Sequence, residues 1–313
     1  MSRRGWVLFA SMSVIWGMPY LLIKIAVGGV PVPVLVLARV VIGAAILLPI
    51  AVYRGQFSAL RPVWRWVALF AVVEIIAPWL VLSEAERNIS SSLTGLLLAS
   101  VPIIVAIISL VIGGDDRLSW VRWAGLLVGL AGVALLAGPH LVGSRGGGAV
   151  ARSVGEVLFV ALCYATGPLI ANRKLAAAPP VGMTAACLLL AAVAYAPLAA
   201  FSWPSAIPSG KVLASIAGLA VICTALAFLI FFRLIAEAGP ARASVITYVN
   251  PAIAIALGFA VLGEQVTPAM LLAFAAILAG SVLATRRGAA TTATGDGAAS
   301  APEVAAAAAA GRG

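Results

Sequence analysis

One acidic residue, Glu74, interrupts the apolar stretch LFAVVEIIAPWL at residues 69–80. If the stretch crosses a bilayer, a charge there costs about 2.5–3.5 kcal/mol on insertion scales, so Glu74 should face a partner or a water-filled cavity. Pro78 has no backbone N–H and therefore cannot bond the carbonyl of Glu74. A carboxylate and a free carbonyl then lie at one bent point, which favours a site for a substrate or an exchangeable proton.

A structural alternative for Glu74 is a fixed ion pair with Lys24 or Arg39, which would keep the carboxylate ionised and brace two helices. Both cations lie nearer to the outer ends of their predicted spans. Arg39 is about 9 Å inside its span, so both a structural role and a role in substrate contact remain open for this residue. Lys24 is more typical of a long side chain that extends to the membrane interface. We expect Glu74 to bind substrate or couple protons.

Aromatic and polar side chains in other predicted spans extend this candidate site. Aromatic faces beside one acid suit a cation through cation–π attraction. In the stretch TYVNP, Pro251 frees the carbonyl of Thr247 beside further donors and acceptors. Besides Glu74, Lys24 and Arg39, the candidates are Trp16, Tyr20, Trp79, Tyr164, Tyr248 and Asn250. The predicted helix breaks are Pro19, Pro78, Pro102, Pro168 and Pro251.

The composition is that of a polytopic, all-α membrane protein. Of the 313 residues, 63% are hydrophobic and 10% are charged, and the mean hydropathy is +1.15, outside the range of soluble domains. Apolar runs of about 20 residues, the length that crosses a bilayer, recur along the chain. The ten predicted spans are 6–27, 33–53, 65–83, 91–112, 119–138, 154–173, 181–201, 211–232, 243–262 and 267–285.

The net charge of +10 does not indicate nucleic acid, because no basic cluster is interleaved with aromatic residues. The basic residues instead follow the positive-inside rule. With the N-terminus in the cytoplasm, the inner segments hold thirteen arginines and lysines and the outer segments hold four. We therefore expect cytoplasmic N- and C-termini.

Two stretches of the sequence, at 98–138 and 247–287, resemble each other. In both, a proline (Pro102 or Pro251) lies about one span ahead of a glycine-acid turn. The period is about five spans, an odd number, so the two copies would have opposite orientations in the bilayer. The predicted organisation is a five-helix repeat at 1–140, a linker loop at 141–153, a second five-helix repeat at 154–285 and a disordered cytoplasmic tail at 286–313.

The remaining polar residues suggest no catalysis, metal site or cofactor. His140 falls in a predicted loop, and the three cysteines (Cys163, Cys187 and Cys223) are read as small core residues. The loop acids are interpreted as helix-end or solvated charges; these are Glu84, Glu86, Asp115 and Asp116. The stretch NISSSLTG at 88–95 is either a polar entrance to the site or a helix N-cap followed by small packing residues.

These features resemble the EamA-type transporters of the drug/metabolite transporter superfamily. The resemblance covers about residues 6–285 and rests on three features: Trp16, Gly17 and Lys24 in the first span, Arg39 in the second, and the paired proline and glycine-acid turns. It implies a ten-helix bundle in the bacterial inner membrane, with a central cavity between inverted halves that exports small metabolites or drugs. The family leads us to expect an apolar or small residue at Glu74, so the coupling mechanism need not be shared.

The predicted function is export of a small amphipathic or cationic metabolite or drug by alternating access. The expected partners are a small-molecule substrate and the lipid bilayer, without nucleic acid. Three alternatives stay open: an exchanger of anionic substrates that uses Arg39 and Lys24 with Glu74 as their brace, a sensor or assembly protein that transports nothing, and a membrane-embedded enzyme. The oligomeric state also stays open, with a homodimer among the alternatives.

Overall fold

The computed structural model describes residues 1–111, 120–141 and 147–285, and every regular element in these ranges is a helix. The predicted all-α class is therefore confirmed. The predicted tail at 286–313 and the acidic turn with Asp115 and Asp116 lie outside the described residues.

Among the described residues, nine helical segments are long and apolar enough to cross a membrane. Four of these segments comprise several consecutive elements: α1 (Arg3–Gly17) and α2 (Pro19–Ala26); η1 (Ser58–Val63), α4 (Trp64–Ala71), η2 (Val72–Ile76) and α5 (Ala77–Ala85); α6 (Ser91–Leu98) and α7 (Val101–Val111); and α11 (Gly210–Ala217), η3 (Gly218–Leu226) and α12 (Ala227–Ala238). The other five are α3 (Val32–Tyr53), α8 (Trp120–Leu141), α9 (Gly147–Lys174), α10 (Pro180–Phe201) and α15 (Pro268–Thr285).

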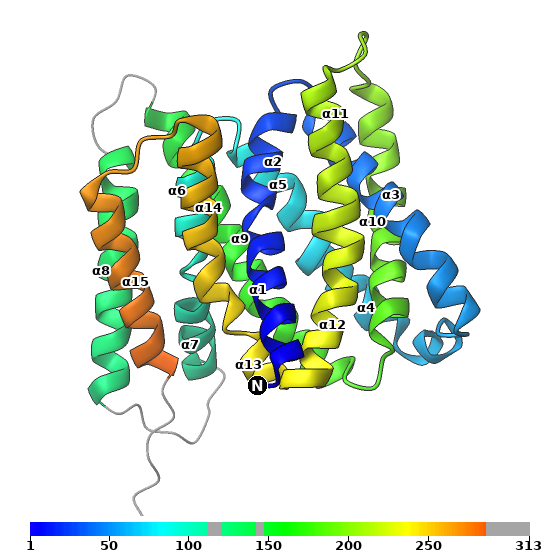
Figure 1. The fold of residues 1–313 in the computed structure, drawn as a ribbon, viewed down its shortest axis with the longest axis horizontal. Helices are drawn as coiled ribbons and strands as arrows, with labels where there is room; N and C mark the ends of the chain where they lie inside the picture. Colours follow the sequence, from blue (N-terminus) through cyan, green and yellow to red (C-terminus); the bar gives the residue numbers. More distant parts are fainter. Residues whose placement is uncertain (112–119, 142–146, 286–313) are drawn as a thin grey trace, which may run out of the picture.

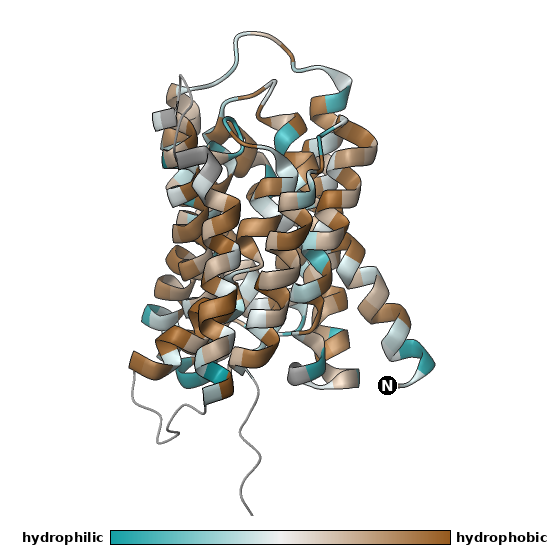
Figure 2. Ribbon diagram, turned by 90° about the vertical axis from the view of Figure 1, so that its left-hand side faces the viewer, coloured by the Kyte–Doolittle hydropathy of each residue, from teal (hydrophilic) through white to brown (hydrophobic). Residues whose placement is uncertain are grey.

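The region of the predicted ninth span holds a shorter apolar helix of 17 residues, α14 (Ile246–Leu262). The four-residue helix α13 (Pro240–Ala243) precedes it. The helices lie side by side, and the N-terminus lies at the same end as the last turns of α12 and α15 (Figure 1). Hydrophobic residues dominate the middle of the molecule and hydrophilic residues gather toward its two ends (Figure 2). This distribution suits a bilayer, where helices satisfy their own backbone hydrogen bonds.

Prolines interrupt some helices and not others. Pro19 separates α2 from α1, Pro102 lies in the first turn of α7 after the break at 99–100, and Pro78 is the second residue of α5, just after the irregular segment η2. In contrast to the predicted breaks, α9 continues through Pro168 and α14 through Pro251. A proline removes one backbone hydrogen bond, and neighbouring helices can hold the remaining turns in place.

The connection between the two predicted repeats is shorter than the sequence suggested. Helix α8 continues through His140 to Leu141. The backbone of His140 is therefore helical, and the prediction that His140 lies in a loop is wrong. Helix α9 already begins at Gly147. In its added turns Arg152 donates a hydrogen bond to Glu156 at 2.7 Å, an i,i+4 pair that favours a helix.

Helices that are five spans apart in the sequence pack on each other, namely α3 on α10, α6 on α14 and α8 on α15. The α8–α15 contact depends on glycine. A Cβ atom at Gly125 would lie 2.6 Å from the backbone nitrogen of Ala284, and one at Gly280 would lie 2.6 Å from the carbonyl oxygen of Gly125. Small residues therefore let these two backbones approach closely, as they do in many membrane helix pairs.

Candidate functional site

Glu74 lies in the middle of the third membrane-spanning segment, and its carboxylate points toward α9. The residue is half-buried, but its Oε2 atom is inaccessible and has no hydrogen-bond partner among the described residues. A Cβ atom at Gly167 of α9 would overlap this oxygen. Cys163 and Tyr164 of α9 and Cys187 of α10 lie within electrostatic range of the carboxylate. Glu74 thus occupies a space that α9 leaves open by carrying a glycine.

The backbone around Glu74 is a π-helical segment, in which the N–H of Ala77 donates to the carbonyl of Val72, five residues earlier. Such segments are rare and are frequent at functional sites. Pro78 follows at once and cannot donate a backbone hydrogen bond. The hydroxyl of Tyr195 on α10 donates to the carbonyl of Ile76. The irregular backbone is thus stabilised by a side chain from a distant part of the sequence.

The eighth segment contains a second π-helical segment, η3, in the region that the sequence repeat aligns with Glu74. It carries Cys223 and Thr224, both buried. The hydroxyl of Thr224 donates to the carbonyl of Leu219, five residues earlier, at 2.8 Å. Both segments therefore contain the same backbone irregularity, but only the third carries a carboxylate there.

Arg39 joins three elements near the centre of the molecule. It is 7% exposed, and its Nε donates to the hydroxyl of Thr224 at 2.9 Å. Its guanidinium carbon lies 3.6 Å from the ring centroid of Trp79 on α5, a cation–π contact that gains strength when shielded from water. Its two Nη atoms donate no hydrogen bond to any residue of the described ranges.

Lys24, in the last turn of α2, contacts the connection between α5 and α6. Its Nζ donates to the carbonyl oxygens of Glu86 at 2.6 Å and Ile89 at 2.8 Å. Glu86 was expected from the sequence to be a helix-end or solvated charge; it does lie at the C-terminal end of α5, but it is not solvated. Its side chain is fully buried, and neither carboxylate oxygen has a partner among the described residues. The physical reason is tertiary packing, because Lys24 of α2 bonds the backbone of this connection.

Neither cation pairs with Glu74. The ion pairs among the described residues are Arg87 with Glu84 and Arg152 with Glu156, each within one helical turn. Lys24 and Arg39 instead bond a connection and a neighbouring helix, as described above. The fixed ion pair considered for Glu74 therefore receives no support from this arrangement.

The polar stretch NISSSLTG forms the N-terminus of α6 and binds a carboxylate. The backbone N–H and hydroxyl of Ser91 donate to Oε1 of Glu264 at 2.8 and 2.9 Å, and those of Ser92 donate to Oε2 at 2.9 and 2.5 Å. Ser90 caps the same helix by accepting from the N–H of Leu93. Burial raises the pKa of Glu264, but these four hydrogen bonds outweigh it and lower the pKa below its ordinary value. Of the two interpretations of the stretch NISSSLTG, the structure shows the helix N-cap, at Ser90.

Of the other predicted site residues, Tyr20 lies within electrostatic range of Arg39 and Tyr164, whereas Trp16 and Asn250 make separate contacts. Trp16 packs on Phe228 and Phe231 of α12, with ring centroids 6.1 and 4.6 Å away. Tyr20 contacts α6, because a Cβ atom at Gly95 would lie 3.6 Å from its ring. With its amide in the orientation that its surroundings favour, Asn250 donates to the carbonyls of Ile246 at 3.0 Å and Ser13 at 3.2 Å, which ties α14 to α1. Tyr248 is half-buried on α14.

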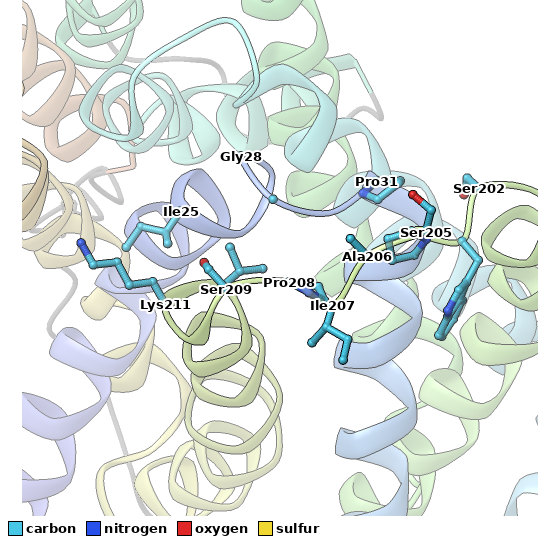
Figure 3. Close-up of a pocket in the computed structure, with 14 residues that line it drawn as sticks. Ile25, Gly28, Pro31, Ser202, Ser205, Ala206, Ile207, Pro208, Ser209 and Lys211 are labelled. Carbon is cyan, nitrogen blue, oxygen red and sulfur yellow. The ribbon is translucent and has the colours of Figure 1, made fainter.

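A separate surface groove of about 780 Å³ lies between the α2–α3 connection and the α10–α11 connection. Its walls include Ile25, Gly28 and Pro31 on one side and the segment 202–209 with Lys211 on the other (Figure 3). None of the predicted site residues lines it. The groove therefore adds no support to the site around Glu74, and the central cavity stays a prediction.

Known proteins resemble this chain over most of its length. The sequence model of the EamA-like transporter family matches residues 3–138 and again residues 154–286. The uncharacterized inner membrane transporter YedA of Escherichia coli K12 is 28% identical over 278 residues, 87% of each chain. A probable terminal-alkyne amino-acid exporter of Streptantibioticus cattleyicolor is 25% identical, over 92% of this chain and 95% of the relative.

A solved crystal structure superposes on this chain with a TM-score of 0.63 at 22% sequence identity, and 90% of this chain and 96% of the other are covered. That similarity shows a shared fold. The two matches to the family model together cover most of the chain. The chain therefore belongs to the EamA-like transporter family, and nine helical segments of its described residues are long and apolar enough to cross a membrane.

Proposed function

We propose that this protein is a secondary transporter that exports a small amphipathic or cationic metabolite or drug by alternating access, with proton exchange at Glu74. In this proposal ten helices form two five-helix halves of opposite orientation, and both termini lie in the cytoplasm. The chain is a multi-pass protein of the bacterial inner membrane. Its substrates are small molecules that reach the protein from the aqueous phase or the bilayer.

Two observations support inverted halves. The family model matches the chain twice, once on each side of the connection near residue 145. Helices that are five spans apart also pack in pairs, which is the contact pattern expected when two related halves face each other across a pseudo-twofold axis. The basic residues add support for the orientation, because the last turns of α3 and α9 lie at the end that holds the N-terminus (Figure 1). Arg54 directly follows α3 in the sequence, and Arg173 and Lys174 are the last residues of α9.

The buried, unpartnered Oε2 atom of Glu74 is the observation that carries the proposed mechanism. An ionised carboxylate without a cation or a hydrogen bond is unfavourable in a membrane interior, whereas a protonated one is tolerated. A cationic substrate could take the place of that proton. Binding of one would then release the other, which is the exchange that proton-coupled export requires.

Arg39 favours a second candidate substrate class. Because its Nη atoms donate no hydrogen bond to any described residue, they are free to bind an anionic group, such as a carboxylate. Lys24 is a weaker candidate for the same role, since two carbonyls already occupy its ammonium group. An amino acid carries both charges, and one relative is named a probable amino-acid exporter. Amino acids are therefore the first substrates to test, beside polyamines and cationic drugs.

Flux measurements in proteoliposomes test this proposal. Wild type, Glu74→Gln and Glu84→Gln would be loaded with each labelled compound, and efflux would be followed with and without an opposing proton gradient. Glu84 is the matched control because it is an exposed acid on the same segment. We expect the gradient to accelerate wild-type and Glu84→Gln efflux and to have no effect on Glu74→Gln. Absence of flux for every compound would favour a sensor or assembly protein.

A further inference from the structure

Glu86 is fully buried, and it is the acid whose two carboxylate oxygens both lack a partner among the described residues. It directly follows α5, twelve residues after Glu74, and its side chain is 0% exposed. Twelve residues of helix span about 18 Å, so Glu86 lies at the end of the segment and Glu74 lies near its middle. The charged and titratable groups that act on Glu86 are Lys24 and Tyr20 of α2, Arg39 of α3, and Glu264 in the turn after α14.

The nearest cation does not neutralise Glu86. Lys24 directs its ammonium group to the backbone carbonyl of Glu86 and to that of Ile89, at 2.6 and 2.8 Å. Both carboxylate oxygens remain without a donor among the described residues. A buried carboxylate that lacks hydrogen bonds is strongly disfavoured, so this geometry fits the protonated acid.

Glu264 provides an internal contrast at the same end of the molecule. Each of its oxygens accepts one N–H and one O–H bond from Ser91 or Ser92, and it lies at the N-terminus of α6, which favours negative charge. The hydrogen bonds favour the ionised form of Glu264, whereas burial raises the pKa of Glu86 well above its ordinary value and Lys24 and Arg39 only oppose that effect. Two acids of one cluster thus have environments that favour opposite protonation states.

We propose that the Glu86 carboxyl group is a second proton-binding site, which holds its proton while Lys24 bonds the two carbonyls and releases it when the ammonium group turns to the carboxylate. On release, the O–H bond of the acid breaks and the proton passes to water at the outer end. Lys24 keeps its three protons and its charge, so no further reactant is needed. The site is independent of Glu74 and holds whether or not Glu74 couples transport.

The pH dependence of thermal stability tests the site without any substrate. An acid whose pKa is raised in the folded protein stabilises it fully below the unfolded pKa, about 4.3, and this stabilisation is lost as the pH rises toward the folded pKa. The melting temperature of wild type, relative to Glu86→Gln, should therefore fall by about 2 °C or more per pH unit between about pH 5 and 8. Glu84→Gln removes an exposed acid two residues away, so its melting temperature should change with pH in the same way as that of wild type.

If the melting curves of Glu86→Gln and wild type keep a constant difference over this range, the proposal is overturned. The comparison does not involve Glu74, because that residue is present in both proteins and its contribution cancels. A failure here would leave the flux experiment on Glu74 unaffected. Conversely, loss of the proposed exchange at Glu74 would leave the Glu86 titration in place.

A labelling experiment on the wild-type protein covers the case in which Glu86→Gln does not fold. Dicyclohexylcarbodiimide is an apolar reagent that couples to protonated carboxyl groups in apolar surroundings. After reaction at pH 7, the peptide between Arg65 and Arg87 would be fragmented so that Glu86 is resolved from Glu74 and Glu84. The proposal requires Glu86 to be labelled to a clearly greater extent than Glu264, and any other pattern contradicts it.

Discussion

Gly167 of α9 faces Glu74 so closely that a Cβ atom at residue 167 would overlap the carboxylate oxygen Oε2. The absence of a side chain at one residue thus creates the space for the acid at the other. Neither the hydropathy of α9 nor the position of Pro168, the next residue, indicates this relationship. It makes Gly167 a determinant of where the Glu74 carboxylate points.

Replacement of Gly167 by alanine should therefore displace the carboxylate without unfolding the protein. The overlapping atom is the end of a flexible side chain, which can rotate away more easily than a helix can shift. We expect Gly167→Ala to lose the proton-gradient response of transport while its melting temperature changes by only a few degrees. Gly155→Ala is the control, since a Cβ atom at Gly155 of the same helix meets nothing within 4 Å. Wild-type coupling in Gly167→Ala would contradict the proposed position of the acid.

Glu74→Gln should alter ligand binding in a way that depends on pH. A ligand that binds only the folded protein raises the melting temperature by mass action. If Glu74 exchanges a proton for a cation, polyamines or cationic drugs should stabilise the wild type more at higher pH, and Glu74→Gln should lose this difference. A thermal-shift screen of the detergent-purified protein at two pH values measures both. A variant that melts far lower yet binds the same ligands would identify Glu74 as a structural brace.

The sequence predicted the class of the fold because hydropathy is a local property. Runs of apolar residues indicated each membrane-spanning helix, and the described ends differ mainly where polar residues continue a helix, as around Arg152. The contacts of Glu86 and Glu264 were not predictable in this way. Glu264 bonds Ser91 across 173 positions of sequence, and Lys24 bonds the backbone of Glu86 across 62 positions. Such contacts depend on tertiary packing, which no single stretch of sequence encodes.

Arg39 should prove sensitive to loss of its partner Thr224. Thr224→Val keeps the shape of the side chain but leaves the buried Nε of Arg39 without its acceptor, which typically costs about 1–3 kcal/mol. We expect a lower melting temperature for Thr224→Val. Thr166→Val is the control, because the hydroxyl of Thr166 bonds only Leu162 of its own helix. Equal effects of the two substitutions would show that the Arg39–Thr224 bond does not contribute to stability.

Arg39→Lys keeps the charge of Arg39 but removes both the bond from its Nε to Thr224 and the stacking on Trp79. Lysine keeps the positive charge but lacks the planar group that stacks on an indole ring and donates in a fixed direction. If Arg39 also binds a substrate carboxylate through its Nη atoms, Arg39→Lys should weaken stabilisation by amino acids and leave stabilisation by polyamines unchanged. The same thermal-shift screen reports both, and parallel loss for the two ligand classes would indicate a general structural effect.

Glu264 gives the most direct pH prediction, because its pKa is lowered by the four hydrogen bonds from Ser91 and Ser92 despite the opposing effect of burial. A group with a lowered folded pKa stabilises the protein above its unfolded pKa, about 4.3, and this contribution is lost as the pH falls through the folded value. At pH 7, Glu264→Gln should reduce stability by about 0.5–2 kcal/mol, the range for loss of a helix cap.

The difference between wild type and Glu264→Gln should then shrink as the pH falls below about 4, where the wild-type carboxylate becomes protonated. This pH dependence has the opposite sign to that of Glu86, whose stabilising effect is present at low pH and lost as the pH rises. Melting curves of wild type, Glu264→Gln and Glu86→Gln across the same pH series therefore test both assignments together. If the two variants shared one pH profile, the four bonds to Ser91 and Ser92 would not distinguish the two acids, and the assignment of opposite protonation states would fail.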